Sequence, residues 1–261
     1  MTRSAVFVTA ALLLFGCSTP PPVSRTEPLD QAVPVATEDP GVVALAHALE
    51  EAVRTRQALV GVARMSLQAP DLRFSQSQRI ALMRPASLRV EILGLFDQVA
   101  AVLAIDGLRY QLYESGNSEL REGDLGRGLL WQVARIDLEP EEVVGLLLGA
   151  PVQSVSSLES ARELDDGSVL LGFRHLASGT RRIFEFDASS RLVRVRQRAP
   201  DDVLVWEAAY TEYGALGEPA FAREVEIEFP EQNARANFHF RQVGFKPELP
   251  ASLFVLEKPS R

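Results

Sequence analysis

The sequence is poor in the residues that build disulfide frameworks and metal centres. Its 261 residues include one cysteine, which excludes an intrachain disulfide, and only three histidines. His47, His175 and His239 lie far apart in the sequence, which disfavours a zinc site. The sequence also has no phosphate-binding loop, no Gly-x-Ser-x-Gly, no His-Glu-x-x-His and no dinucleotide-binding fingerprint. We therefore expect no catalytic residues, no metal and no cofactor, and a protein that is not an enzyme.

Basic residues are fewer than acidic residues. The 27 Lys and Arg stand against 35 Asp and Glu, which gives a formal net charge of -8. A dedicated nucleic-acid binder normally presents a basic face, so we expect no nucleic-acid partner. Hydrophobic residues make up 46% of the chain and charged residues 24%, which is typical of a globular protein.

The apolar run at the N-terminus is too short to span a bilayer stably. Arg3 precedes an apolar segment, residues 4–16, and this order is typical of a signal peptide. The segment ends in Leu14-Phe15-Gly16-Cys17, which resembles a bacterial lipobox. The resemblance implies cleavage before Cys17 and acylation of Cys17. The alternative is an ordinary secretory signal with an incidental cysteine.

Acyl chains on Cys17 would hold the protein on a membrane, because each buried methylene contributes about 0.8 kcal/mol. Ser18 follows the cysteine, and by resemblance to the enterobacterial sorting rule it favours the outer membrane. We therefore expect a signal peptide (1–16), a lipidated cysteine with a proline-rich disordered tether (17–40) and a folded domain (41–261). The expected location is the periplasmic face of the bacterial outer membrane.

The spacing of apolar residues in the folded part changes once along the chain, from a helical period to a period of two. Apolar residues over 42–53 have helical spacing, and Asp39 or Pro40 suits the start of that helix. Beyond it apolar residues alternate with polar ones, which predicts strands. One face is apolar and the other charged, so we expect a single sheet with one solvated side. The strands are expected within 61–67, 74–82, 88–92, 99–105, 108–112, 169–173, 184–186, 193–195, 204–210, 225–229 and 234–240.

A short apolar helix is expected between the two sets of strands. Glu139 to Glu142 place negative charge at its start, and Pro140 fits its first turn. Gly149 and Pro151 end it. Its body, residues 143–148, is almost entirely apolar, so it must be covered by the apolar face of the sheet.

This arrangement resembles the LolA/LolB superfamily, whose members form an incomplete antiparallel barrel with helices on the open side. The segments that carry the resemblance are 136–151, 88–113 and 249–254. The expected fold is therefore mainly β with helices (α+β), a single curved antiparallel sheet forming an incomplete β-barrel whose open side is covered by helices.

The resemblance implies a binding protein with an apolar cavity for acyl chains. For each residue of such a cavity the alternative is a place in a dry core. The candidate cavity residues are Met65, Leu88, Val90, Ile92, Leu103, Leu146, Leu147, Phe184, Phe186, Trp206, Ile227, Phe238 and Phe240.

The turn Gly94-Leu95-Phe96-Asp97 is a candidate membrane-insertion loop. By resemblance to LolB, Leu95 or Phe96 would enter the membrane, and the alternative is a turn whose apolar residues pack back onto the sheet.

Three functions remain open at this point. The first is an outer-membrane lipoprotein that binds acyl chains of lipoproteins or lipids and acts in their transfer, with a periplasmic LolA-like carrier as a possible partner. The second is a non-catalytic envelope scaffold or stress-sensing interaction lipoprotein of the same fold. The third is an enzyme with an unrecognised site.

Overall fold

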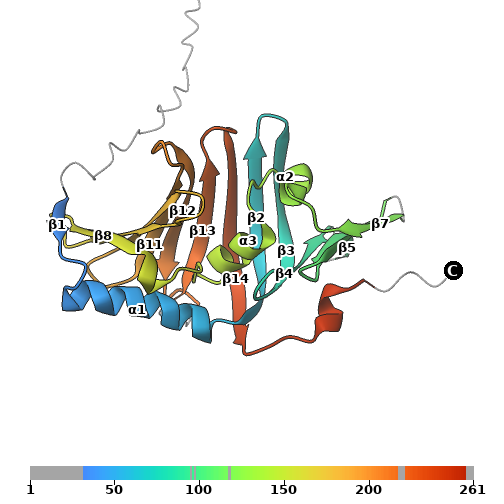
Figure 1. Cartoon of the computed structure of the whole chain (residues 1–261). Coiled ribbons are helices and arrows are strands. Elements are labelled where there is room, and N and C mark those ends of the chain that lie inside the picture. The colour runs from blue at the N-terminus through green and yellow to red at the C-terminus, as the bar shows by residue number, and fades with distance from the viewer. Residues whose placement is uncertain (1–31, 95, 97, 117–118, 217–220, 257–261) are drawn as a thin grey trace, which may run out of the picture. The chain divides into compact units, whose positions relative to one another are not determined.

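The computed structural model describes residues 32–94, 96, 98–116, 119–216 and 221–256. The expected signal peptide, Cys17 and Leu95 lie outside these residues. The described part contains three α-helices and a fourteen-stranded antiparallel sheet (Figure 1). None of the helices in these ranges combines the length and apolarity that a bilayer crossing requires.

The helices are short relative to the sheet. They are α1 (Pro40–Thr55), α2 (Leu129–Ala134) and α3 (Pro140–Leu147), with 3-10 helices η3 (Val155–Ser157) and η4 (Ala251–Phe254). The strands are β1 (Val33–Val35), β2 (Ala58–Ala69), β3 (Leu72–Met83), β4 (Ser87–Leu93), β5 (Val99–Ile105), β6 (Arg109–Glu114), β7 (Glu119–Asp124), β8 (Leu158–Glu163), β9 (Val169–Arg174), β10 (Arg181–Phe186), β11 (Leu192–Arg198), β12 (Leu204–Tyr213), β13 (Ala222–Phe229) and β14 (Ala234–Lys246).

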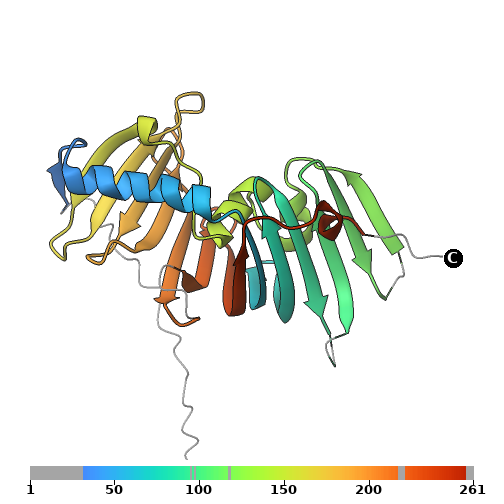
Figure 2. The same cartoon turned by 90° about the horizontal axis from the view of Figure 1, so that it is seen from below.

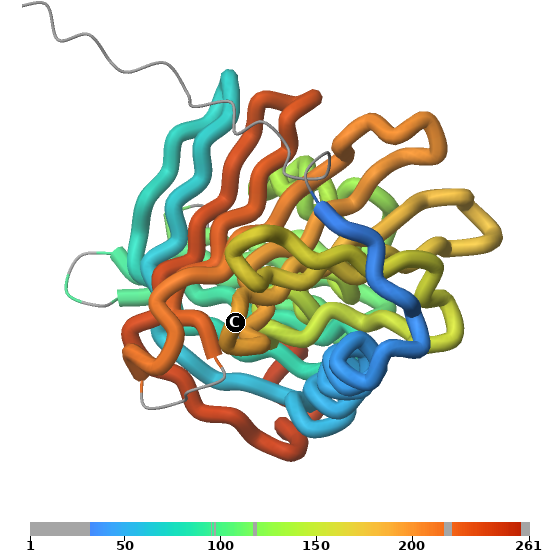
Figure 3. Tube along the Cα trace, turned by 90° about the vertical axis from the view of Figure 1, so that its left-hand side faces the viewer, coloured from blue at the N-terminus to red at the C-terminus, as the bar shows by residue number. Residues whose placement is uncertain are grey.

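The sheet is one continuous surface built from two meanders. β2 to β7 run outward from the centre, and the chain then crosses through α2 and α3 to the opposite edge. β8 to β14 return towards the centre, where β14 pairs with β2, with Phe240 opposite Ala63. The strand order is β1-β8-β9-β10-β11-β12-β13-β14-β2-β3-β4-β5-β6-β7. Figure 3 shows that the sheet curls strongly.

Strand alternation places apolar side chains on the concave face, which carries Met65, Ile80, Val90 and Leu103. The described residues form an open sheet rather than a closed barrel, with helices packed against the concave apolar face. The predicted fold class, an incomplete barrel with helices on its open side, is confirmed.

The predicted N-terminal helix is confirmed as α1. The Asp39 carboxylate accepts hydrogen bonds from the Gly41 and Val42 backbone amides at 2.8 and 3.4 Å, and Pro40 occupies the first turn. Val42, Ala46 and Leu49 are buried in the main core, as a helical period requires.

The predicted boundary between tether and domain, at residue 41, is wrong. Ala32 is already buried, and β1 is the edge strand of the sheet, paired with β8 so that Pro34 lies opposite Arg162. Proline is tolerated there because an edge strand has one side without ladder partners. The folded unit therefore includes residues that the proline content assigned to the tether.

The predicted apolar helix is confirmed as α3, and it is held firmly at both ends. Glu139 and Glu142 form a capping box at its start. At its C-terminal end Arg56 donates to the carbonyls of Leu148 and Gly149 at 3.2 and 2.9 Å, and Arg84 donates to the carbonyl of Ala150. These two cations complement the negative end of the helix dipole and satisfy carbonyls that the helix leaves unpaired.

A C-terminal strap, residues 247–256, lies on the convex face of the sheet (Figure 2). Phe254 and Leu249 are buried there against Ala58 and Ala81. Arg89 donates to the Leu253 carbonyl at 2.9 Å, and Gln111 accepts from the Leu256 amide at 2.6 Å. The strap covers apolar side chains that would otherwise face water on the outer side of β3 to β6.

The central pairing depends on a glycine. β14 has an irregularity between Phe240 and Gln242, and Gly61 lies opposite Val243 just beyond it. A Cβ at Gly61 would lie 2.6 Å from the Gln242 carbonyl oxygen, closer than atoms can approach without backbone movement. Gly244 is a matched control, because a Cβ there meets Val60 at an ordinary 3.7 Å.

We predict that Gly61→Ala lowers the free energy of unfolding by about 1–3 kcal/mol, because the strands must separate at the centre of the sheet. Urea denaturation measures this change. Gly244→Ala should change stability by less than about 1 kcal/mol. Equal effects of the two substitutions would contradict the close approach.

The convex face of β13 carries a row of acidic residues, Glu224, Glu226 and Glu228. Arg235 on β14 pairs with Glu228 at 2.5 Å and lies 3.7 Å from Glu226. Burial raises the pKa of the Glu226 carboxyl, and Glu224 and Glu228 add to the rise while Arg235 opposes it. The folded state therefore favours the protonated form of Glu226.

Because this pKa is raised in the folded state, Glu226 supports the fold best at low pH, and that support is lost as the pH rises through the folded-state pKa. We predict that Glu226→Gln has a melting temperature close to that of the wild type near pH 4 and above it at pH 7. Thermal unfolding across this range measures the difference. A difference that shrinks as the pH rises would contradict the prediction.

Candidate functional site

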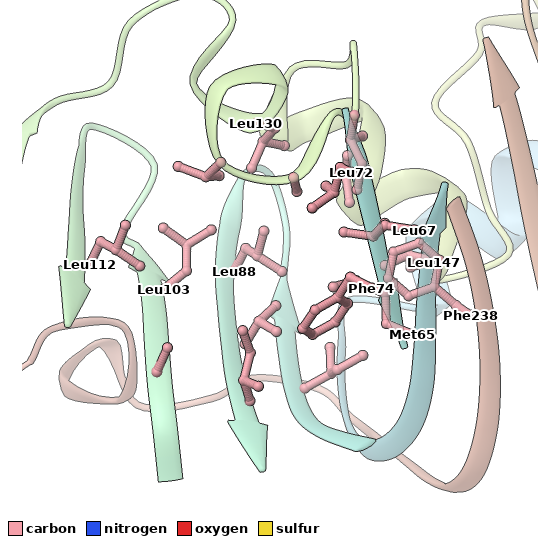
Figure 4. Close-up of a pocket in the computed structure, with 18 residues that line it drawn as sticks. Met65, Leu67, Leu72, Phe74, Leu88, Leu103, Leu112, Leu130, Leu147 and Phe238 are labelled. Atoms are coloured by element: carbon pink, nitrogen blue, oxygen red, sulfur yellow. The ribbon is translucent and has the colours of Figure 1, made fainter. Parts of the chain in front are cut away.

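A cavity of about 160 Å³ lies on the concave face between the β2–β6 half of the sheet and the helices α2 and α3 (Figure 4). Every side chain that lines it is apolar. The lining residues are Met65, Leu67, Leu72, Phe74, Ile80, Leu88, Val90, Ile92, Ala101, Leu103, Leu112, Leu130, Val133, Ala134, Ile136, Val143, Leu147 and Phe238. Such a lining suits hydrocarbon and offers no group for acid–base or nucleophilic chemistry.

The residues predicted for a cavity separate into two groups. Those that line it are Met65, Leu88, Val90, Ile92, Leu103, Leu147 and Phe238. Those that are buried in the main core and do not line it are Leu146, Phe184, Phe186, Trp206, Ile227 and Phe240.

The second group lies on or near the β8–β14 half of the sheet, where large rings fill the curve. Trp206 is 1% exposed, and the Arg182 guanidinium stacks 5.3 Å from its ring. Phe173 and Phe184 pack edge to face at 5.3 Å. The Tyr210 hydroxyl donates to the Leu146 carbonyl at 3.2 Å, and burial raises the Tyr210 pKa. In this half the predicted cavity residues pack in the core, whereas the apolar cavity lies against the other half.

The helix α2 covers one end of the cavity and contributes Leu130, Val133 and Ala134 to its wall. It has six residues and begins at Gly128, which has no side chain to cap it. Beyond its end, Arg135 pairs with Asp71 in the β2–β3 turn at 2.6 Å, and this ion pair lowers the pKa of Asp71. Asp71 is exposed and Arg135 half-buried, and α2 buries two residues where α3 buries six, so α2 is less firmly attached than α3.

Phe96 lies in the β4–β5 connection and is 93% exposed. Its φ of 59° lies in the left-handed region, which is costly for a bulky residue. The described part of the predicted insertion loop thus holds an aromatic ring in water on a strained backbone. Its predicted partner Leu95 lies outside the described residues.

A group of possible metal ligands also occurs away from the cavity. Glu212, Glu224 and His239 offer atoms within 4.8 Å of one another. Both carboxylates already have partners, because Glu212 pairs with Arg223 at 3.4 Å and Glu224 accepts from Asn237 at 2.8 Å. We assign no role to this group.

Comparison with known proteins identifies the fold. No family model and no curated protein matches the sequence. Among solved structures, a LolA superfamily protein from Nitrosomonas europaea superposes with a TM-score of 0.54 at 13% identity, covering 81% of this chain and 97% of that chain. The fold is LolA-like. This agrees with the resemblance stated from the sequence and extends over most of the chain.

Two further solved structures are similar to this chain. A DUF1329 family protein from Desulfovibrio piger gives a TM-score of 0.53 at 12% identity, and it covers 81% of this chain and 95% of its own. A candidate outer membrane lipoprotein-sorting protein domain from Vibrio parahaemolyticus gives 0.51 at 11% identity, with the same coverage of 81% and 95%.

Several lining residues were missed by the sequence analysis. Leu67 and Leu112 lie in predicted strands, and Leu72 lies two residues before one. All three alternate in step with residues of the cavity face, so the alternation could have identified them. Leu130 and Val133 belong to α2, which was not predicted because six residues are too few to show a helical period. Leu130 and Val133 are part of the wall that α2 contributes to the cavity.

We predict that truncation is less costly beside the hollow than in the filled half. Leu171→Ala, at a site with no exposure, should lower the free energy of unfolding by about 2–5 kcal/mol, as for other fully packed leucines. Leu103→Ala should cost no more than the low end of that range, because one side of Leu103 already faces the cavity. Urea denaturation of both variants makes the comparison. A larger loss for Leu103→Ala would show that the cavity is filled.

Proposed function

We propose that this chain is an outer-membrane lipoprotein whose cavity binds acyl chains and which acts in lipoprotein or lipid transfer at that membrane. The observation that supports the proposal most is the wholly apolar lining of a cavity on the concave face. Each methylene that enters it gains about 0.8 kcal/mol relative to water. The gain favours binding from water, and a bilayer offers a similar gain on release.

The size of the cavity implies movement when a chain binds. A cavity of about 150 Å³ in another protein holds a molecule as large as benzene. At about 160 Å³ the cavity here accepts only part of an acyl chain as it stands. Of the two helices that cover it, α3 has six buried residues and is also held by Arg56 and Arg84, whereas α2 has two buried residues, Leu129 and Leu130, and the ion pair of Arg135 with the exposed Asp71. We therefore assign α2 as the element that moves to admit the chain.

The membrane-side assignments complete the proposal. Acylated Cys17 anchors the protein on the periplasmic face of the outer membrane, and the chain that follows it up to the folded unit serves as a tether. Phe96, exposed and strained, contacts the bilayer during delivery. A periplasmic LolA-like carrier is the expected donor of the acyl cargo.

A second candidate function rests on the filled half of the concave face. Trp206 and the rings around it are buried in the core of that half, as expected if the fold serves as a scaffold or stress-sensing interaction protein. The two functions differ in whether the hollow half binds hydrocarbon.

The proposal can be tested with a soluble form, residues 18–261. It retains every described helix and strand, since the main core and the apolar contacts beneath the C-terminal strap lie between residues 32 and 256. We predict that it binds a dansyl-labelled fatty acid and that Ala101→Phe, which fills the cavity, weakens binding at least about tenfold, the equivalent of 1.4 kcal/mol.

Ala100→Phe is the matched control, because the Ala100 side chain lies on the opposite face of β5 from Ala101 and the cavity. It should leave the affinity unchanged. Failure of the wild type to bind, or equal binding by wild type and Ala101→Phe, would contradict the proposed cavity function.

We predict that Phe96→Asn slows transfer of the bound probe into phosphatidylethanolamine–phosphatidylglycerol vesicles by about fivefold to tenfold. The change removes an exposed ring that would bury apolar area in the bilayer. Asparagine tolerates the left-handed backbone, so stability should not fall. Leu176→Asn, at another hairpin and 90% exposed, should transfer at the wild-type rate. Equal slowing by the two substitutions would show that the β4–β5 connection has no special role.

A further inference from the structure

The concave face carries a fully buried amide among its apolar side chains. Gln78 on β3 is 0% exposed. Both its Oε1 and its Nε2 are buried and have no hydrogen-bond partner among the residues that the structure describes. Most buried polar groups in folded proteins are satisfied, so this amide requires an explanation.

Gln78 lies next to the wall of the cavity. It stands directly opposite Ile92 on β4 and opposite Ala63 on β2. Ile80, two residues along the same strand and on the same face, lines the cavity, as does Ile92. Gln78 thus neighbours two residues of the cavity wall, on the face against which a bound chain would lie.

The chemistry of the amide selects the group that can satisfy it. A glutamine side chain offers one carbonyl acceptor and an NH₂ donor. An ether or ester oxygen only accepts, and it would leave Oε1 unpaired. A hydroxyl or an un-ionised carboxyl both donates and accepts, so it satisfies the two atoms at once. Leaving them unpaired in apolar surroundings is unfavourable.

We infer that Gln78 is a polar anchor of the cavity that recognises an alkyl or acyl chain carrying a hydroxyl or an un-ionised carboxyl group. The inference rests on the proposed function, since it names the ligand chemistry of the same cavity. It adds a selectivity that the apolar lining alone does not provide, because hydrocarbon contacts do not distinguish a hydroxyl from an ether.

The test compares two probes of similar shape, 1-octanol and 1-methoxyoctane, by calorimetry on the soluble form 18–261. The hydroxyl of octanol donates and accepts, and the ether oxygen only accepts. We expect the ratio of the two affinities to fall about tenfold in Gln78→Met relative to the wild type, the change that loss of a hydrogen bond produces. Gln76→Met, at an exposed glutamine two residues along the same strand, should keep the wild-type ratio.

A second measurement checks that the amide is unsatisfied without ligand. Gln78→Met should raise the melting temperature of the ligand-free protein, because an apolar side chain of similar shape replaces a buried polar one. A lower melting temperature would show that the protein or an ordered water already satisfies the amide, and would overturn the inference. Gln78→Leu repeats both measurements if the methionine variant does not fold.

The outcomes separate the inference from the function beneath it. If both probes bind and their affinity ratio is the same in wild type and Gln78→Met, the cavity binds chains and the inference about Gln78 is wrong. If neither probe binds the wild type, the proposed acyl-chain function fails, and the inference fails with it.

Discussion

A curled sheet with one apolar face must keep that face out of water, and in this protein the face is covered unequally. α1 and the rings of β9, β10 and β12 fill one half, where Trp206 and Phe184 are almost completely buried. The other half is covered by α2 and α3, and its side chains are mostly leucine, isoleucine and valine. The cavity therefore results from the size of the side chains on the concave face, which are large rings in one half and mostly smaller aliphatic chains in the other.

The way the helices are attached links packing to function. α3 is fixed by a capping box, by Tyr210 and by two arginines at its C-terminal end. α3 contacts both halves of the concave face, since Leu146 packs in the core and Leu147 lines the cavity. α2 is shorter, buries fewer residues and is followed by the ion pair of Arg135 with the exposed Asp71. This difference in attachment is the reason that we assign the movement on binding to α2.

Much of the fold could be predicted from alternation, because period-two patterns such as Leu88-Val90-Ile92 mark a half-buried strand directly. The order of the strands could not, since the pairing of β14 with β2 joins segments distant in sequence. β1 was missed because Pro34 is incompatible with a central strand. An edge strand accepts a proline, and β1 lies at the edge. Alternation places Leu103 and Trp206 equally on an inner face. Whether an inner residue faces a hollow or a neighbour depends on side-chain volumes from several strands, which no local pattern contains.

The central claim is that the hollow half of the sheet takes up hydrocarbon. Native mass spectrometry of residues 18–261, purified after expression in a bacterial periplasm without detergent, tests it most directly. We expect a population that carries the added mass of an acyl lipid, which collisional activation releases and which Ala101→Phe lacks. The bare polypeptide mass alone, or the same adduct on the filled variant, would contradict it.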